Sequence, residues 1–311
     1  MAEAHLLRPA QHTPRSLIVT LYGAYGRTAA GAALAVAELI RLMDALGVDA
    51  PSVRSSVSRL KRRGLLVPER TPGGAAGYAL SREARELLDD GDERILARPE
   101  PRPGDGWVLA VFSVPEAERN KRHLLRSRLG GLGFGTVAPG VWVAPDRFRD
   151  EALRTLRRLG LDPYVDLFHG EHLGFTPTAD AVARWWDLDA LARLHTEFLR
   201  VQEPVLRSWE ERGVPEGQDG GEGREARRDP PAAQAYRDHL LALDSWRRLP
   251  YADPGLPPAL LPRRWPGARS ADVFFRLHAL LREPALSHVR EVRSGLAEQA
   301  ARPRRPGPAA D

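Results

Sequence analysis

The stretch DAPSVRSSVSRLKRRGLL, residues 49–66, decides how the first third of the chain is interpreted. Its pattern predicts a helix that is capped by Asp49 and tolerates Pro51 in its first turn. The helix is expected to end near Arg63 and Gly64. Side chains are separated by about 100° around such a helix, so the sequence also predicts what each face carries.

One face of this predicted helix is apolar and the other is basic. The narrow apolar stripe that would dock on a neighbouring helix consists of Val53, Val57 and Leu60, with Ala50 close by. The centre of the opposite face is expected to hold Ser55, Ser58 and Arg62, flanked by Arg54, Arg59 and Lys61. Small hydroxyl side chains allow a helix to approach base edges, and arginine can donate two hydrogen bonds to guanine or to phosphate.

Two interpretations of the basic face compete. The first is an ordinary solvated surface helix, which is the better interpretation of a basic helix taken alone. The second is a DNA recognition helix. From Arg54 to Arg70 the chain holds six cationic residues and one acidic residue, Glu69, so the local net charge of +5 equals that of the whole protein.

The flanking segments favour the second interpretation. Residues 34–47 (LAVAELIRLMDALG) have apolar residues at helical spacing and end in a glycine. After the basic helix, LLVPER and GYALS surround the Gly-rich TPGGAA, which predicts a β-hairpin. Helix, tight turn, basic helix and hairpin is the order of a winged helix-turn-helix. Double-stranded DNA is the expected target, because the exposed face has no aromatic side chains for stacking on single-stranded bases. The predicted DNA contacts are Ser52, Arg54, Ser55, Ser58, Arg59, Lys61, Arg62, Arg63 and, in the wing, Arg70.

The rest of the chain predicts an α+β protein with two further domains. RPEPRPGDG is a proline-rich linker, and the segments after it follow the order βαββαβ of a ferredoxin-like domain. We expect a loose arm at 1–14, a winged helix domain at 15–97, the linker at 98–106, a ferredoxin-like domain at 107–176, and a helical C-terminal domain at 179–300 with a mobile loop at 213–231 and a disordered tail at 301–311.

The composition narrows the range of functions. The 311 residues are 42% hydrophobic and include no cysteine, which excludes disulfides and thiolate metal sites and fits a reducing cytoplasm. No apolar run reaches the roughly 20 residues that span a bilayer, so a cytoplasmic protein without a membrane partner is expected. No phosphate-binding loop, dinucleotide-binding glycine motif or nucleophile motif is present, so neither a cofactor nor an enzymatic activity is predicted.

Three further patterns have a structural and a functional interpretation. The basic segment 119–128 could contact phosphate, but Glu116 and Glu118 beside it favour a solvated face. Histidine and carboxylate groups suited to a metal occur at His169, Glu171, His172 and His195, but without a metal-binding spacing, so no metal site is predicted. The C-terminal tryptophans favour core packing over the wall of a ligand pocket; they are Trp185, Trp186, Trp209, Trp246 and Trp265.

Several passages together resemble the PaaX family, bacterial repressors of phenylacetate catabolism. The resemblance rests on SLIVTLYGAYG, SRLKRRGLL, WVLAVFSVPEAERNKRHLLRSRLGGLGFGTVAPGVWVAP and LPPALLPRRWPGARSADVFFRLHALL, and it extends from residue 15 to about 285. It implies a winged helix, a central ferredoxin-like domain and a helical C-terminal domain. It also implies a homodimer that binds a partly palindromic operator and is released by an acyl-CoA effector such as phenylacetyl-CoA. No effector-binding residue can be assigned from it.

A second resemblance provides the alternative function. The central domain is similar to small CRISPR-associated endoribonucleases, which need an aspartate just after their first strand. Here the passage is VFSVPE, with Ser113 at the position of the acid. A metal-dependent nuclease is therefore disfavoured, because no carboxylate is present there to hold the metal. A third possibility is a regulator that has lost its effector site and responds only to protein partners.

Overall fold

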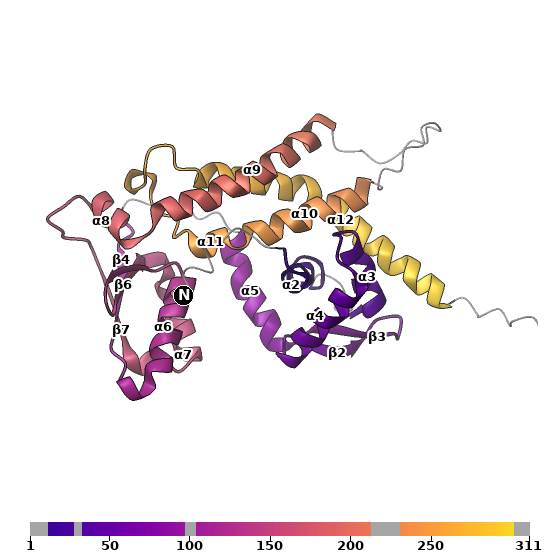
Figure 1. The fold of residues 1–311 in the computed structure, drawn as a ribbon, viewed down its shortest axis with the longest axis horizontal. Helices are drawn as coiled ribbons and strands as arrows, with labels where there is room; N and C mark the ends of the chain where they lie inside the picture. Colours follow the sequence, from indigo (N-terminus) through magenta and orange to yellow (C-terminus); the bar gives the residue numbers. More distant parts are fainter. Residues whose placement is uncertain (1–11, 28–32, 97–103, 213–230, 302–311) are drawn as a thin grey trace, which may run out of the picture. The chain divides into compact units, whose positions relative to one another are not determined.

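The computed structural model describes residues 12–27, 33–96, 104–212 and 231–301, with side chains up to residue 296. Helices predominate, and the strands form two separate sheets, which confirms the predicted α+β class (Figure 1). The structure divides into two compact units, which we name by their sheets. Among the described residues, the four-stranded unit comprises 94–96, 104–203 and 245–273, and the three-stranded unit comprises 12–27, 33–93, 204–212, 231–244 and 274–301.

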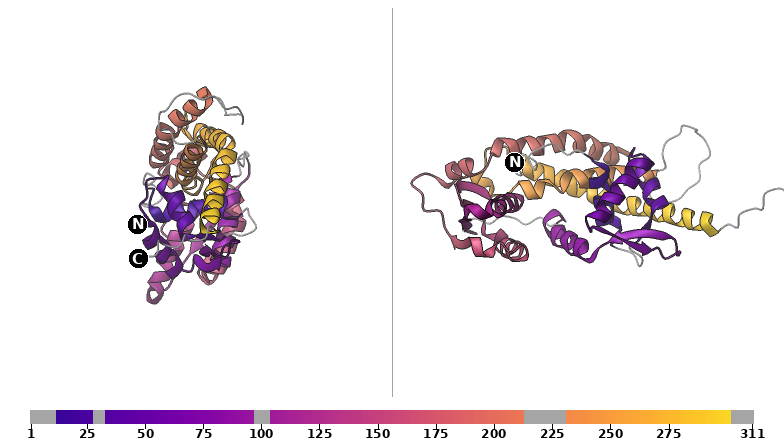
Figure 2. Two further views of the ribbon diagram at one scale, coloured as in Figure 1. Left: turned by 90° about the vertical axis from the view of Figure 1, so that its right-hand side faces the viewer. Right: turned by 60° about the horizontal axis from the view of Figure 1, so that its bottom comes forward.

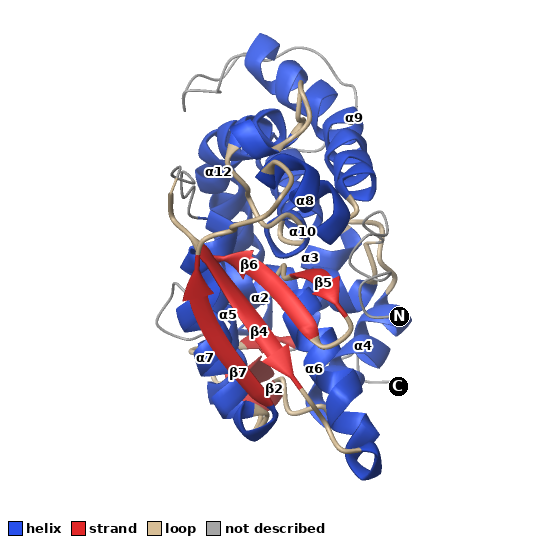
Figure 3. Ribbon diagram, turned by 90° about the vertical axis from the view of Figure 1, so that its left-hand side faces the viewer, coloured by secondary structure: helices blue, strands red, loops and turns tan. Residues whose placement is uncertain are grey.

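The four-stranded unit is built on one antiparallel sheet. Its elements are β4 (Trp107–Phe112), α6 (Arg119–Gly131), β5 (Gly135–Ala138), β6 (Val141–Pro145), α7 (Arg149–Arg158) and β7 (Val165–Gly170), followed by α8 (Thr178–Trp185) and α11 (Leu249–Ala252). The strand order is β5-β6-β4-β7, and every neighbouring pair is antiparallel (Figure 3).

Each face of this sheet has its own apolar cover. On one face Val108, Ala110 and Trp142 pack with Leu125 of α6 and Leu156 of α7. The other face buries Val143 with Val182 of α8 and with Trp186, which follows that helix. Alternation of side chains along the strands explains the two covers, because neighbouring residues point to opposite faces.

The position of Trp186 explains why β5 has a glycine at residue 135. A Cβ added at Gly135 would lie 2.6 Å from the Trp186 ring, so only glycine leaves room for the indole against β5. The Trp186 indole nitrogen donates to the Gly133 carbonyl at 3.0 Å.

The three-stranded unit combines the start of the chain with segments from its end. Its elements are α2 (Pro14–Tyr25), β1 (Leu34–Ala35), α3 (Val36–Asp44), α4 (Ala50–Arg62), β2 (Leu66–Arg70), β3 (Ala76–Leu80) and most of α5 (Arg82–Leu96) and α10 (Pro231–Trp246). The strand order is β1-β3-β2. The last part of α9 (Leu188–Arg212) and most of α12 (Gly267–Ala301) complete the unit.

One predicted helix begins later than expected. The spacing of apolar residues predicted a helix from Leu34, but Leu34 and Ala35 instead pair with Tyr78 and Gly77 of β3. The helix begins at Val36, where the Glu38 carboxylate accepts a hydrogen bond from the Ala35 nitrogen at 2.7 Å. Periodicity did not reveal this strand because its partner lies more than forty residues away in the chain.

The core of this unit joins both ends of the chain. Helix α2 contributes a nearly continuous apolar surface, including Leu17, Ile18 and Leu21, which are at most 1% exposed. The same cluster includes Tyr236 and Leu240 of α10 and Ala285 and Val289 of α12. The C-terminal helices therefore complete the core into which α2, α3 and α4 pack.

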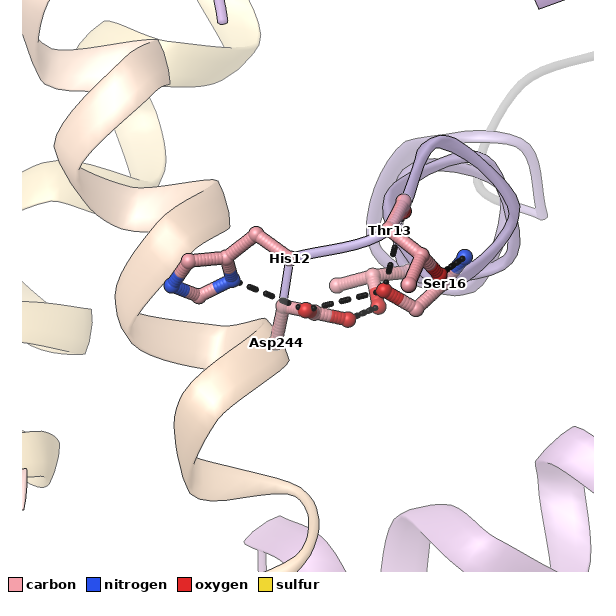
Figure 4. A network of polar contacts seen from close by, with 5 residues as sticks. His12, Thr13, Ser16 and Asp244 are labelled. Carbon is pink, nitrogen blue, oxygen red and sulfur yellow. Dashed lines mark hydrogen bonds and ion pairs between the residues drawn. The ribbon is translucent and has the colours of Figure 1, made fainter. Parts of the chain in front are cut away.

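A buried carboxylate holds the start of α2 against α10 (Figure 4). Asp244 is 2% exposed. Its oxygens lie 2.8 Å from Thr20 Oγ1, 3.1 Å from Ser16 Oγ and 3.0 Å from His12 Nδ1. A buried carboxylate is tolerated only when several donors satisfy it, and these three supply that requirement.

The end of α2 is also attached to α10, by a histidine pair. The Tyr25 hydroxyl hydrogen-bonds to His239 Nδ1, and His239 Nε2 lies 3.0 Å from His278 Nδ1 on α12. Burial lowers the pKa of His239 to about 3, with a further contribution from His278, so the ring is neutral at physiological pH. A neutral imidazole can serve as a donor on one side and an acceptor on the other.

The two longest helices, α9 and α12, are continuous although each contains a proline, Pro204 and Pro284 (Figure 2). Among the described residues, no helix is both long and apolar enough to cross a membrane. The predicted mobile loop, apart from Pro231 at the start of α10, lies outside the described residues. The same holds for most of the predicted arm, for most of the linker and for all of the tail except the helical Ala301.

Asp244→Asn tests the contribution of the buried carboxylate. The amide keeps the shape but loses the charge and one acceptor, so the free energy of unfolding should fall by about 1–3 kcal/mol in urea denaturation. Glu83→Gln on the exposed side of α5 is the control and should change it by less than about 0.5 kcal/mol. Equal effects of the two substitutions would contradict the stabilising role of Asp244.

Candidate nucleic-acid interface

Helix α4 forms as its sequence predicts. Asp49 is the N-cap, and its carboxylate accepts a hydrogen bond from the Ser52 nitrogen at 2.7 Å. This bond lowers the pKa of the Asp49 carboxyl. Beyond the last turn, Gly64 has a φ of 69°, a left-handed conformation that suits glycine. The predicted bounds of the helix are confirmed to within one residue.

The predicted division of α4 into two faces is also confirmed. Val53, Val57 and Leu60 are at most 4% exposed and belong to the core. The side chains predicted to face outward are all exposed; they are Arg54, Ser55, Ser58, Arg59, Lys61 and Arg62. Arg63, another predicted DNA contact, is exposed as well. Ser52 is half-buried, and its hydroxyl donates to the Asp49 carboxylate at 3.1 Å, so its proton is already used within the cap.

The cations of α4 and its C-cap Arg63 have no carboxylate partners among the described residues. Within the part of the chain that the structure describes, Arg54, Arg59, Lys61, Arg62 and Arg63 form no ion pair. Elsewhere in the same unit, Arg27 pairs with Asp89 and Asp92, and Arg276 pairs with Glu210. Helix α4 thus presents positive charge that the described part of the protein leaves uncompensated.

The β-hairpin that the sequence predicts follows α4. Strands β2 and β3 pair antiparallel from Leu66–Leu80 to Arg70–Ala76. Thr71 and Ala75 close the tip, and Gly74 has a φ of 79°. The Arg70 guanidinium donates to the Gly74 carbonyl at 2.8 Å, which leaves its other donors at the exposed tip.

An open hollow of about 400 Å³ lies between α2 and α4. Its lining residues are Arg15, Ser56, Arg59, Arg62 and Arg63. Three of these arginines were predicted as DNA contacts, whereas Arg15 and Ser56 were not. The sequence could not indicate Arg15, because its position beside α4 depends on how the two helices pack.

The other basic helix differs from α4 in its charge balance. Lys121 of α6 pairs with Glu118, and Arg122 pairs with Glu116 at 3.0 Å. The predicted effect of the acidic neighbours is therefore confirmed, since they offset part of the positive charge of this segment. At the end of β4, exposed Ser113 donates its backbone N–H to the Tyr164 carbonyl at 3.1 Å.

The histidines singled out by the sequence each have a different partner. His169 lies 2.8 Å from Asp146, His172 lies 3.2 Å from Thr178, and His195 lies 2.7 Å from Asp253. Across residues 12–27, 33–96, 104–212 and 231–301, no group of three or more potential ligands is placed to hold a metal ion.

The tryptophans pack as the core interpretation predicts. Trp186, Trp209 and Trp246 are at most 8% exposed, and Trp185 and Trp265 pack on the cluster that contains Trp186.

Protein-family models match the chain along most of its length. A model described as PaaX-like protein matches residues 13–84, and one described as PaaX protein central Cas2-like domain matches 100–182. A third, the PaaX-like protein C-terminal domain, matches 186–291. The chain belongs to the PaaX family.

Individual relatives of this PaaX-family chain are distant. The transcriptional repressor PaaX of Escherichia coli (strain K12) is 23% identical over 279 residues, which are 89% of this chain and 83% of that protein. Among solved structures, the uncharacterized protein Rv0674 from Mycobacterium tuberculosis matches with a TM-score of 0.54 and 20% identity. The match covers 91% of this chain and 98% of that one, so it shows a shared fold.

Two substitutions on opposite faces of α4 test the assignment of those faces. Leu60→Ala removes a buried side chain, and we expect the free energy of unfolding to fall by about 2–5 kcal/mol. Ser58→Ala on the exposed face should change it by less than about 0.5 kcal/mol. Urea denaturation of both variants checks the assignment, which is wrong if Ser58→Ala is the more damaging change.

Proposed function

We propose that this protein is a transcriptional repressor that binds double-stranded DNA through α4. The exposed face of α4 carries this proposal, because its four cations and the C-cap Arg63 have no ion-pair partner among the described residues. Phosphate groups of DNA would supply the missing counter-charges. Membership in the PaaX family and the repressor from Escherichia coli support the same function. Such a protein acts in the cytoplasm, where bacterial DNA lies.

The contacts divide according to position around the helix. We assign base contacts to the centre of the exposed face, which holds Ser55, Ser58 and Arg62. Phosphate contacts are assigned to the flanks, the helix end and the wing; the residues are Arg54, Arg59, Lys61, Arg63 and Arg70. Ser52 belongs to the N-terminal end of the interface. A helix placed this way reads the major groove while its flanks hold the backbone.

The proposed domain layout follows the order of the elements. Helices α2, α3 and α4 with the β2–β3 hairpin have the order of a winged helix-turn-helix. The succession β4-α6-β5-β6-α7-β7, with strand order β5-β6-β4-β7, supports a ferredoxin-like central domain. The helices after residue 178 then make up the C-terminal domain.

We further propose that the protein binds its operator as a homodimer and leaves it when an acyl-CoA effector binds. Two recognition helices on a palindromic site must match the spacing of its half-sites. An effector that favours a different spacing would shift the population away from the binding-competent state. The contacts of α10 and α12 with α2 support this mechanism, since they attach C-terminal helices to the proposed DNA-binding region.

Paired substitutions on α4 separate base recognition from phosphate binding. Arg62→Ala should reduce discrimination between operator and unrelated duplex by about 1–3 kcal/mol. Lys61→Ala should weaken binding to both duplexes equally. It should also reduce the slope of log affinity against log salt concentration by about 1, which corresponds to one phosphate contact. Mobility-shift assays over a range of salt concentrations measure both effects. If neither variant differs from the wild type, α4 is not the recognition helix.

Titration with acyl-CoA thioesters tests the regulatory part. An effector such as phenylacetyl-CoA should bind in calorimetry and weaken the binding of operator. Bound operator should in turn weaken the binding of the effector by the same factor. Free coenzyme A is the control for the acyl group. A thioester that binds without changing operator affinity contradicts release by the effector, and absence of binding by every thioester would indicate a regulator that responds to protein partners.

A further inference from the structure

The hollow between α2 and α4 concentrates charge from two helices. Arg59 and Arg62 come from the last turns of α4, Arg63 is its C-cap, and Arg15 comes from the first turn of α2. Ser56 also lines the hollow and is 9% exposed. Four guanidinium groups therefore line one open space of about 400 Å³.

These four guanidinium groups lack counter-charges in the described part of the chain. None of them forms an ion pair there, and none donates to the carbonyl groups that end α4. The hollow is thus not explained by ordinary capping of a helix end, in which basic side chains bind the last carbonyls. Like charges gathered in one place repel each other, and a bound anion offsets that repulsion.

The position of Arg15 is fixed by its neighbours. Thr13 caps α2 by accepting a hydrogen bond from the Ser16 nitrogen at 3.1 Å, and Ser16 Oγ lies 3.1 Å from the buried Asp244. Ser16, directly after Arg15, is therefore attached both to the cap residue Thr13 and to α10. The N-terminal end of a helix also carries partial positive charge, which adds to the attraction for an anion.

We propose that this hollow binds one backbone phosphate of duplex DNA and that Arg15 is part of the DNA interface. A phosphodiester offers two charged oxygens, which match the paired donors of guanidinium groups. DNA is favoured over a small phosphorylated ligand because Arg62 lines the hollow and also belongs to the exposed face assigned to bases. The inference rests on the proposed function and adds to it a contact made by α2.

The hollow also explains how α4 would be held in a groove. Arg54 and Lys61 lie on one flank of the exposed face, and Arg59 and Arg63 lie on the other. A major groove is bordered by two phosphate backbones. One backbone would meet Arg54 and Lys61, and the other would place a phosphate in the hollow beside Arg15.

Binding of DNA by the full chain tests the proposal. The affinities of wild type, Arg15→Ala and Arg82→Ala are measured by fluorescence anisotropy for an operator duplex selected from random sequences and for an unrelated duplex, at several KCl concentrations. Arg15→Ala should weaken binding to both duplexes by the same factor and reduce the slope of log affinity against log salt by about 1. Arg82→Ala removes an exposed arginine that is paired with Glu86 on α5, and it should leave the slope unchanged. Circular dichroism melting confirms that each variant folds.

The outcomes separate this proposal from the proposed function. If wild type binds DNA with a strong salt dependence and Arg15→Ala behaves identically, the hollow does not bind backbone phosphate. If wild type binds neither duplex, the proposed function itself fails. Calorimetry with inorganic phosphate adds a third arm. Loss of phosphate binding in Arg15→Ala with unchanged DNA binding would assign the hollow to a small anion and overturn the proposal.

Discussion

The packing of α2 is the constraint on which the three-stranded unit depends. This helix buries apolar side chains against α3 and α4, and it shares the same core with Tyr236 of α10 and Ala285 of α12. Its two ends are held to α10 by different chemistry, a buried carboxylate at Asp244 and a neutral imidazole at His239. Because both polar contacts are buried, small displacements of α10 would leave donors or acceptors unsatisfied. Helices α2 and α10 are therefore expected to move as one body.

Some arginines of this chain pair with carboxylates, and others are left without such a partner among the described residues. The sequence contains only two lysines, so abundance alone says nothing about where anions bind. Outside the proposed interface, Arg27 and Arg276 pair with carboxylates, whereas Arg41 and Arg126 form no ion pair among the described residues. The arginines of α4 remain without such partners among the described residues. Charge that is compensated within the protein contributes to its structure, whereas charge left uncompensated is available for a ligand.

The sequence predicted the features that depend on neighbouring residues. The cap at Asp49, the left-handed Gly64 and the buried seam of α4 all follow from local pattern. The sequence did not predict β1, whose two residues pair with a strand far along the chain. It also did not predict Arg15 beside α4, or the entry of α10 and α12 into the N-terminal core. These features arise from contacts between distant segments, which neither periodicity nor propensity encodes.

The shared core has a consequence for the synthesis of the protein. A chain leaving the ribosome exposes α2, α3 and α4 long before Ala285 and Val289 of the same core emerge. Domains usually fold as units during synthesis from the N-terminus onward. Here the core of α2, α3 and α4 is completed only when α12 has been made, so the apolar surface of α2 must await the synthesis of that helix. A prematurely terminated chain would carry the basic helix without the support that orients it.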